Sequence, residues 1–163
     1  MIGDPSKTKP ATTRVTKLYI VTACLALVGL ADSIYLTVQH VTGESVRCTI
    51  VSGCSEVLSS PYASINGIPL ASIGAVAYFT VFSLATLAAF GYPLVGKLLV
   101  LVTGLMFLTT LWLIYLQAFV IGQFCQFCLL SAAVTTLLMI LVVIASRRPL
   151  IHTGLQPGAS RLE

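Results

Sequence analysis

The sequence predicts an all-α integral membrane protein, a bundle of four transmembrane helices with a long outer loop between the first and second helices. Two observations support this prediction. Of the 163 residues, 57% are hydrophobic and only 9% are charged, which is not the composition of a soluble domain. Four nearly uncharged stretches also reach the roughly 20 residues that a helix needs to cross the hydrocarbon core of a membrane.

The first predicted span covers residues 18–38. It follows a polar stretch, residues 1–13, that we expect to be a disordered cytoplasmic tail. A cleavable signal peptide is the alternative interpretation, because basic residues precede the span. However, the apolar run exceeds the usual length of about 7 to 15 residues, and no small-x-small cleavage pattern follows it. We therefore expect this segment to remain and to span the membrane.

Three further spans and a second cytoplasmic tail complete the predicted organisation. The spans are expected at residues 70–91, 98–121 and 124–146, the tail at residues 147–163, and the whole four-helix domain at residues 14–146.

Basic residues set the predicted orientation, because they gather at the cytoplasmic ends of membrane spans. Eight of the nine lysines and arginines fall on one side if both termini are cytoplasmic, and only Arg47 falls in the first loop. The positive net charge then reflects topology and attraction to the inner leaflet, and the sequence contains no nucleic-acid-binding motif.

This topology places four of the five cysteines on the outward-facing side. Cys48 and Cys54 lie in the first loop, and Cys125 and Cys128 form the motif "CQFC" where the fourth helix begins. The outer side of a bacterial inner membrane, or the lumenal side of a membrane in a eukaryote, is oxidising, so disulfides are expected there. The fifth cysteine, Cys24, lies inside the first span, where we expect an inert, buried thiol.

The "CQFC" motif has a definite chemistry. Residues three apart share one helical face, so the two sulfurs can approach, and the unpaired amides of a helix N-terminus favour thiolate over thiol. Three interpretations stay open on these residues alone: a disulfide that only pins the helix, a zinc site, and disulfide exchange between the two pairs. Zinc ribbons usually carry both pairs at short spacing on polar knuckles, so the zinc interpretation fits less well. For exchange, Ser52 and Gly53 permit a turn that would let Cys54 move.

Three motifs together resemble the vitamin K epoxide reductase family, particularly its bacterial disulfide-forming members. They are "CTIVSGCSEVLSS" in the first loop, "GIPLASIGAVAY" entering the second helix and "CQFC" opening the fourth. The resemblance covers about residues 18–146. Its specificity lies in the order of the motifs, with the loop pair first, the CxxC pair last, and a serine six positions after the second loop cysteine.

The resemblance implies a quinone-dependent thiol-disulfide oxidoreductase of the bacterial inner membrane, without a resident metal. Cys48 would exchange with a thioredoxin-like (DsbA-like) protein, and Cys54 would carry electrons from Cys48 to Cys125. Cys128, one turn deeper in the membrane, would reduce the quinone, which is ubiquinone or menaquinone. Many bacterial relatives carry a fused thioredoxin-like domain. None is visible in these 163 residues, so we expect a separate partner.

Ser60 matches the family serine that lies near the quinone, where its hydroxyl would bond a ring carbonyl. Its ordinary alternative is a cap or turn before Pro61. We expect the surrounding "SEVLSSPYASI" to form a short helix and a turn that covers the quinone site, with apolar side chains such as Val57 and Tyr62 facing the bundle or the membrane interface.

Two residues qualify these expectations. Ala132 stands where vertebrate members that process vitamin K have a tyrosine, so vitamin K epoxide reduction proper is the weaker alternative, as is a structural tetraspan that disulfides staple without turnover. Asp32 is the only formal charge within the spans, and such carboxylates commonly have functions. Its shallow depth favours a structural role, with hydrogen bonds to neighbours such as Ser33.

Overall fold

Four long helices dominate the computed structural model of the chain, which describes residues 9–43, 46, 48, 53–90 and 92–147. Each of these helices includes a stretch that is long and apolar enough to cross a membrane, so the predicted four-span architecture is confirmed. They are α1 (Lys9–Thr42), α3 (Leu70–Ala89), α4 (Pro93–Tyr115), which continues into the π-helical turn η3 (Leu116–Ile121), and α5 (Gln126–Arg147).

The first helix is longer than the sequence suggested. It begins at Lys9, so residues 9–13, which we expected in a disordered tail, are helical. Pro10 is compatible with this start, because amides in the first turn of a helix have no intrahelical partner to lose. Residues 1–8 and 148–163, which make up most of the predicted tails, lie outside the described residues, as do Arg47 and Ser52.

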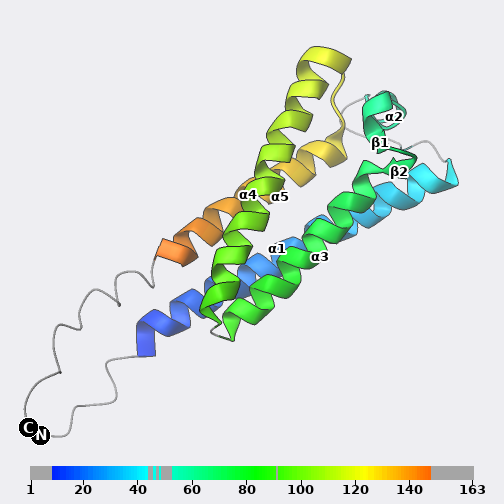
Figure 1. The fold of residues 1–163 in the computed structure, drawn as a ribbon. Coiled ribbons are helices and arrows are strands. Elements are labelled where there is room, and N and C mark those ends of the chain that lie inside the picture. Colours follow the sequence, from blue (N-terminus) through cyan, green and yellow to red (C-terminus); the bar gives the residue numbers. More distant parts are fainter. Residues whose placement is uncertain (1–8, 44–45, 47, 49–52, 91, 148–163) are drawn as a thin grey trace, which may run out of the picture.

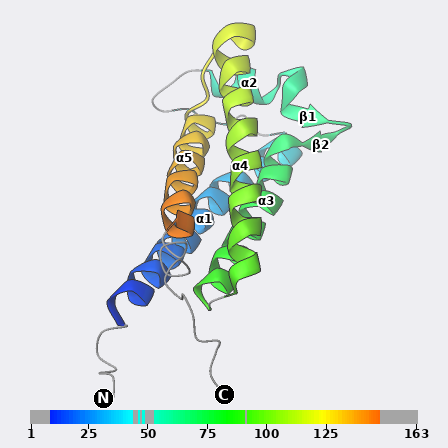
Figure 2. The same ribbon diagram turned by 60° about the vertical axis from the view of Figure 1, so that its left-hand side comes forward.

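The helices form a bundle in which α1 packs against α3 and α5, and α4 packs against the same two helices (Figures 1 and 2). The start of α1 and the end of α5 lie at one end of this bundle. The short helix α2 (Cys54–Leu58) and a small hairpin lie at the other, which we call the α2 end (Figure 1). Cys54, in α2, and the start of α5, where Cys125 and Cys128 lie, are therefore at the same end of the molecule.

The hairpin was not expected from the sequence. After α2 the chain forms a 3-10 turn, η2 (Pro61–Ala63), and then strands β1 (Ser64–Ile65) and β2 (Ile68–Pro69), which pair antiparallel. Asn66 and Gly67 connect the strands with φ angles of 51° and 82°. Asn-Gly is the commonest sequence for a turn with two positive φ angles, and it is the local signal that could have predicted this hairpin.

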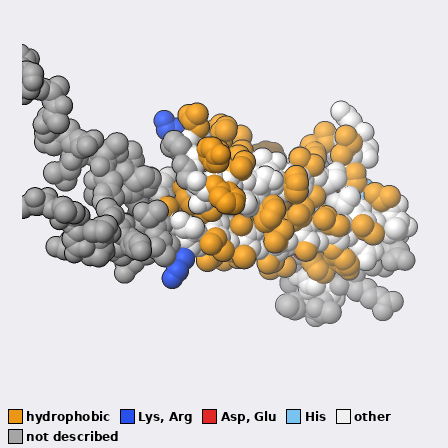
Figure 3. Space-filling model, turned by 90° about the horizontal axis from the view of Figure 1, so that it is seen from below, with side chains coloured by type: hydrophobic (Ala, Val, Ile, Leu, Met, Phe, Trp, Pro, Cys, Tyr) orange, Lys and Arg blue, Asp and Glu red, His pale blue; other side chains and the backbone are white. Residues whose placement is uncertain are grey.

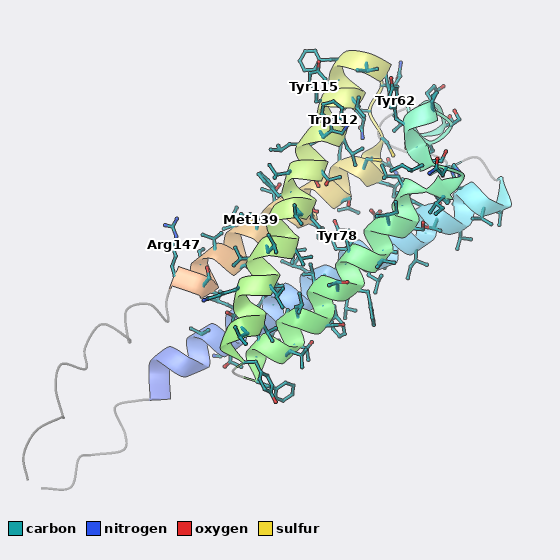
Figure 4. All side chains as sticks on the ribbon, viewed as in Figure 1. Tyr62, Tyr78, Trp112, Tyr115, Met139 and Arg147 are labelled. Atoms are coloured by element: carbon teal, nitrogen blue, oxygen red, sulfur yellow. A yellow bond between two sulfur atoms is a disulfide. The ribbon has the colours of Figure 1, made fainter. Side chains whose placement is uncertain are left out.

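A tyrosine ties the middle of the bundle together. Tyr78 of α3 is almost fully buried, and its hydroxyl bonds Ser131 Oγ and Thr135 Oγ1 of α5, each at 2.8 Å. Gly29 of α1 lies directly against its ring, so closely that a Cβ atom at this position would overlap the ring carbons. Figure 4 shows Tyr78 midway along the bundle. The tyrosine thus fixes the spacing of three helices.

The outer surface of the long helices suits hydrocarbon rather than water. Large apolar side chains such as Val76, Leu101 and Leu108 are more than half exposed. Figure 3 shows apolar side chains over most of one face of the bundle, with Lys and Arg side chains near one end. An apolar surface of this extent is unusual for a soluble protein and is expected of helices that contact lipid.

Candidate functional site

The loop cysteines form a disulfide at the α2 end. Cys48 and Cys54 are bonded to each other, with their Cα atoms 5.8 Å apart. Cys54 is the first residue of α2 and has no exposed surface, whereas Cys48 is partly exposed. Cys48 is therefore the residue of this disulfide that has exposed surface, whereas Cys54 faces the interior of the protein.

The second pair, Cys125 and Cys128, is present as free thiols at the start of α5. Cys125 immediately precedes the helix, and its carbonyl accepts the first helical hydrogen bond, from Leu129 N at 3.0 Å. Its Sγ accepts hydrogen bonds from the Cys128 thiol and from the backbone N–H groups of Phe127 and Cys128. Led by the bond from Cys128, these lower the pKa of Cys125 to about 7 against the opposing effect of burial. This direction agrees with the expectation from the helix N-terminus.

The two cysteine pairs lie together. Cys54 and Cys125 are both fully buried in one apolar cluster, and Cys48 and Cys128 pack against its edge. Gly53 makes this approach possible, because a Cβ atom there would lie 2.8 Å from Gln123 Cβ and 2.9 Å from the carbonyl oxygen of Phe124. The structure therefore brings together the four cysteines that the sequence singled out.

A cavity of about 150 Å³ lies beside Cys128. All four long helices and the segment from α2 to β2 contribute to its mainly apolar lining. Its residues include Asp32, Ser60, Gln117, Cys128, Ser131 and Ala132. A cavity of roughly this volume accommodates one six-membered ring, and an apolar wall with a few polar groups is typical of sites for small organic ligands.

The segment after Cys54 contributes to the lining of this cavity. Val57, Leu58, Ser60, Tyr62 and Ala63 all line it, and Figure 4 shows Tyr62 at the α2 end. Val57 is buried, whereas half of the Tyr62 side chain is exposed. The segment therefore forms part of the cavity wall at the α2 end.

Ser60 combines features of both roles that we considered for it. It lines the cavity beside which Cys128 lies, but its Oγ donates a hydrogen bond of 2.7 Å to the carbonyl of Val57. A hydroxyl has a single proton to donate. To donate to a ligand in the cavity, the Ser60 hydroxyl therefore has to rotate away from Val57.

Sequence reasoning missed Gln117, which supports both thiols of the second pair. This side chain is 4% exposed, and its Oε1 accepts a hydrogen bond of 3.3 Å from the backbone N–H of Cys125. Its side chain also hydrogen-bonds the thiol of Cys128. The available signal was a lone amide side chain near the end of an otherwise apolar span.

Two other residues differ from their predicted environments. Asp32 is buried and lines the cavity, but among the described residues its Oδ2 has no hydrogen-bond partner, so the expected bonding to neighbours such as Ser33 is not seen for that oxygen. Cys24, which we expected to be buried, is exposed on the surface of α1. It lines a groove between α1 and α3 with Phe82 and Thr86, and the hydropathy of the span does not reveal this exposed position.

Comparison with known proteins agrees with this geometry. A model of the vitamin K epoxide reductase family matches residues 20–143, a range that contains both cysteine pairs and nearly all of the four spans. The thiol-disulfide oxidoreductase LTO1 of Arabidopsis thaliana is 32% identical over 123 residues, which are 70% of this chain and 33% of that protein. The chain thus spans about a third of the length of this relative. On these grounds, the chain belongs to the vitamin K epoxide reductase family.

Proposed function

We propose that this protein is a membrane thiol-disulfide oxidoreductase that moves electrons from a soluble thiol protein, through its two cysteine pairs, to a quinone in the membrane. The observation that carries the proposal is the shared buried cluster of Cys54 and Cys125, with Cys128 opening on a cavity. Family membership and the name of the Arabidopsis relative support thiol-disulfide exchange.

Exchange begins at Cys48, the accessible sulfur of the loop disulfide. A thiolate of a thioredoxin-like (DsbA-like) partner attacks Cys48 and releases Cys54 as a thiolate, and the partner's second thiol then resolves the mixed disulfide. The partner gains a disulfide, and Cys48 and Cys54 gain two electrons and two protons.

Cys54 next attacks Cys125 of the oxidised second pair, and Cys48 resolves that intermediate. This restores the loop disulfide and leaves Cys125 and Cys128 as thiols.

The cavity beside Cys128 is the proposed quinone site. Its volume suits one ring, its lining is mainly apolar, and Ser60 and Gln117 supply groups that can hydrogen-bond ring oxygens. A bound quinone, ubiquinone or menaquinone, supplies a two-electron acceptor there. Cys128 is the residue of the second pair that lines this cavity.

The proposed orientation places the α2 end outside a bacterial inner membrane, with both termini in the cytoplasm. Arg147, at the end of α5, lies at the opposite end of the bundle from α2 (Figure 4). The start of α1, the helix that contains Lys17, lies at the same end as Arg147 (Figure 1), and Lys97 lies in the first turns of α4. Such an asymmetry of basic residues marks the cytoplasmic side.

The proposal is tested with the protein in lipid nanodiscs, a reduced thioredoxin-like protein and a soluble ubiquinone or menaquinone analogue. We expect one quinol for each disulfide formed in the partner. Cys128→Ser should lose quinol formation, whereas Cys24→Ser, which removes the cysteine remote from both pairs, should retain it. Full activity of Cys128→Ser would overturn the proposed path.

The same assay separates the alternatives. A structural tetraspan would form no quinol, and its four paired cysteines would stay oxidised whether or not quinone is added. A vitamin K epoxide reductase proper would convert the epoxide when it replaces the quinone. We expect little conversion, because Ala132 offers the cavity no hydroxyl.

A further inference from the structure

Asp32 is a buried carboxyl that the proposed cycle leaves unused. Its side chain is 8% exposed and lines the cavity beside Cys128. Among the residues that the structure describes, Asp32 Oδ2 has no hydrogen-bond partner. The described residues that line the cavity include no lysine or arginine. An unpaired carboxylate is costly in an apolar membrane site, and the carboxyls that do occur there commonly lie on proton paths.

The surroundings of Asp32 connect it to the second cysteine pair. Electrostatic interactions join Asp32 to Cys125 and Cys128. A third such interaction joins it to Tyr78 of α3, whose hydroxyl is already bonded to α5. The other titratable side chains that line the cavity are His40 of α1 and Tyr62 of η2, and both are exposed. Asp32 is thus a buried carboxyl that lines the same cavity as the Cys128 thiol.

Oxidation of the pair releases protons that must reach an acceptor. Closing two thiols to a disulfide releases two electrons and two protons, and a quinone that becomes a quinol takes up two of each. Cys125 loses its proton near neutral pH, since its pKa is lowered to about 7. Cys128 donates a hydrogen bond to Cys125, so its sulfur still carries a proton in the reduced pair.

We propose that the Asp32 carboxylate accepts the proton of the Cys128 thiol as the pair closes, and passes it to an oxygen of the quinone. The S–H bond of Cys128 breaks, an O–H bond forms on Asp32, and the S–S bond forms. The electron pair passes to the quinone. The quinone receives its second proton, the one that Cys125 lost, through water. Transfer of the first proton from Asp32 to the quinone regenerates the carboxylate. Transfer of the proton from Asp32 to the quinone rests on the proposed function, whereas uptake of the Cys128 proton by Asp32 does not.

Infrared difference spectroscopy tests proton uptake without any quinone. Spectra of the Cys24→Ser protein are compared before and after a diazene oxidant closes the Cys125–Cys128 disulfide. Because no quinone is present to receive the proton from Asp32, we expect a carboxyl C=O band of protonated Asp32 that appears as the disulfide closes and is absent from Asp32→Asn. The band should persist in Thr22→Val, a matched control on the same helix, because Thr22 is fully buried but bonds only its own helix, at Leu18 O. An oxidised-minus-reduced spectrum identical in Asp32→Asn and the parent protein would overturn the proposal.

The rate of quinol formation in a single turnover tests whether Asp32 delivers the proton to the quinone. Asp32→Asn should be slower by about 100-fold or more, the usual loss when a general acid–base group is removed, and its pH profile should lose one titration. Thr22→Val should stay within a few-fold of the parent protein, and Asp32→Glu, which retains a carboxyl group, should recover most of the rate that Asp32→Asn loses.

Opening of the Cys48–Cys54 disulfide by the reduced partner should be unchanged in Asp32→Asn, which shows that the variant is folded. A parental quinol rate in Asp32→Asn at every pH, or an equal slowing of both steps, would count against the proposal. If the parent protein forms no quinol, the proposed function fails, and the infrared band still decides whether Asp32 exchanges the proton.

Discussion

Burial and hydrogen bonding distinguish four cysteines that look alike in the sequence. Cys48 is partly exposed, Cys54 and Cys125 have no exposed surface, and Cys128 opens on the cavity. The spacing of "CQFC" and its place at a helix start predicted a stabilised thiolate. Neither feature could reveal Gln117, because a hydrogen bond across eight residues depends on how the turn before α5 folds back.

The pKa of Cys125 gives a pH prediction for the reduced pair. In Cys24→Ser protein with the loop disulfide intact, thiolate ultraviolet absorbance should rise with a midpoint near pH 7. Cys128→Ala should move this midpoint upward, because it removes the hydrogen bond that contributes most to the lowered pKa. An unchanged midpoint in that variant would contradict this assignment.

The same shift affects stability in a defined direction. The unfolded chain binds the Cys125 proton more tightly than the folded chain does. The free energy of unfolding of the reduced protein should therefore increase as the pH rises from about 7 to the ordinary pKa of a cysteine thiol. Thermal unfolding of the reduced protein against pH measures this gain, and Cys128→Ala should show less of it.

Among the elements, the segment from α2 to β2 was the least predictable. Hydropathy located the four long helices within a few residues, except for the start of α1, because a span needs only length and low polarity. A two-residue strand pair gives no periodic pattern, so only the Asn66-Gly67 turn could have revealed the hairpin. The contact of this segment with the turn before α5 depends on tertiary packing.

Gly53→Ala tests that contact. The added methyl group would lie within 3 Å of Gln123 and Phe124, so α2 and the turn must separate. Overpacking costs about 1–3 kcal/mol, and we expect Cys54–Cys125 disulfide formation to slow by about tenfold or more. The rate is measured in protein that retains only these two cysteines. Ser55→Ala, an exposed change on the other side of Cys54, should leave the rate unaltered.

In the whole molecule, one glycine and one tyrosine set the distance between helices that the cavity requires. Gly29 lets α1 approach the ring of Tyr78, and Asp32 follows one turn later on the same face of α1. The sequence showed that four helices were present, but their packing partners and the shared cavity could not be read from it. Small residues at helix contacts in membranes are common, and which of them form contacts is decided by the fold.

Gly29→Ala should therefore destabilise the bundle. The new methyl group meets the Tyr78 ring and forces α1 and α3 apart, which costs about 1–3 kcal/mol of unfolding free energy. Gly104→Ala is the matched control, because a Cβ at that helical glycine of α4 meets nothing within 4 Å. Unfolding in detergent should show a loss for Gly29→Ala alone; equal midpoints for the two variants would contradict this account of the packing.

The complete burial of Cys54 and Cys125 has a kinetic consequence for a cell that contains many other thiols and oxidants. Glutathione and peroxides can react only with a sulfur that they can touch. In the proposed cycle the two middle sulfurs are therefore insulated, and electrons enter at Cys48 and leave at Cys128. The protein would then prevent soluble thiols and oxidants from exchanging electrons with the membrane quinone except through Cys48 and Cys128, even though a single chain connects the two.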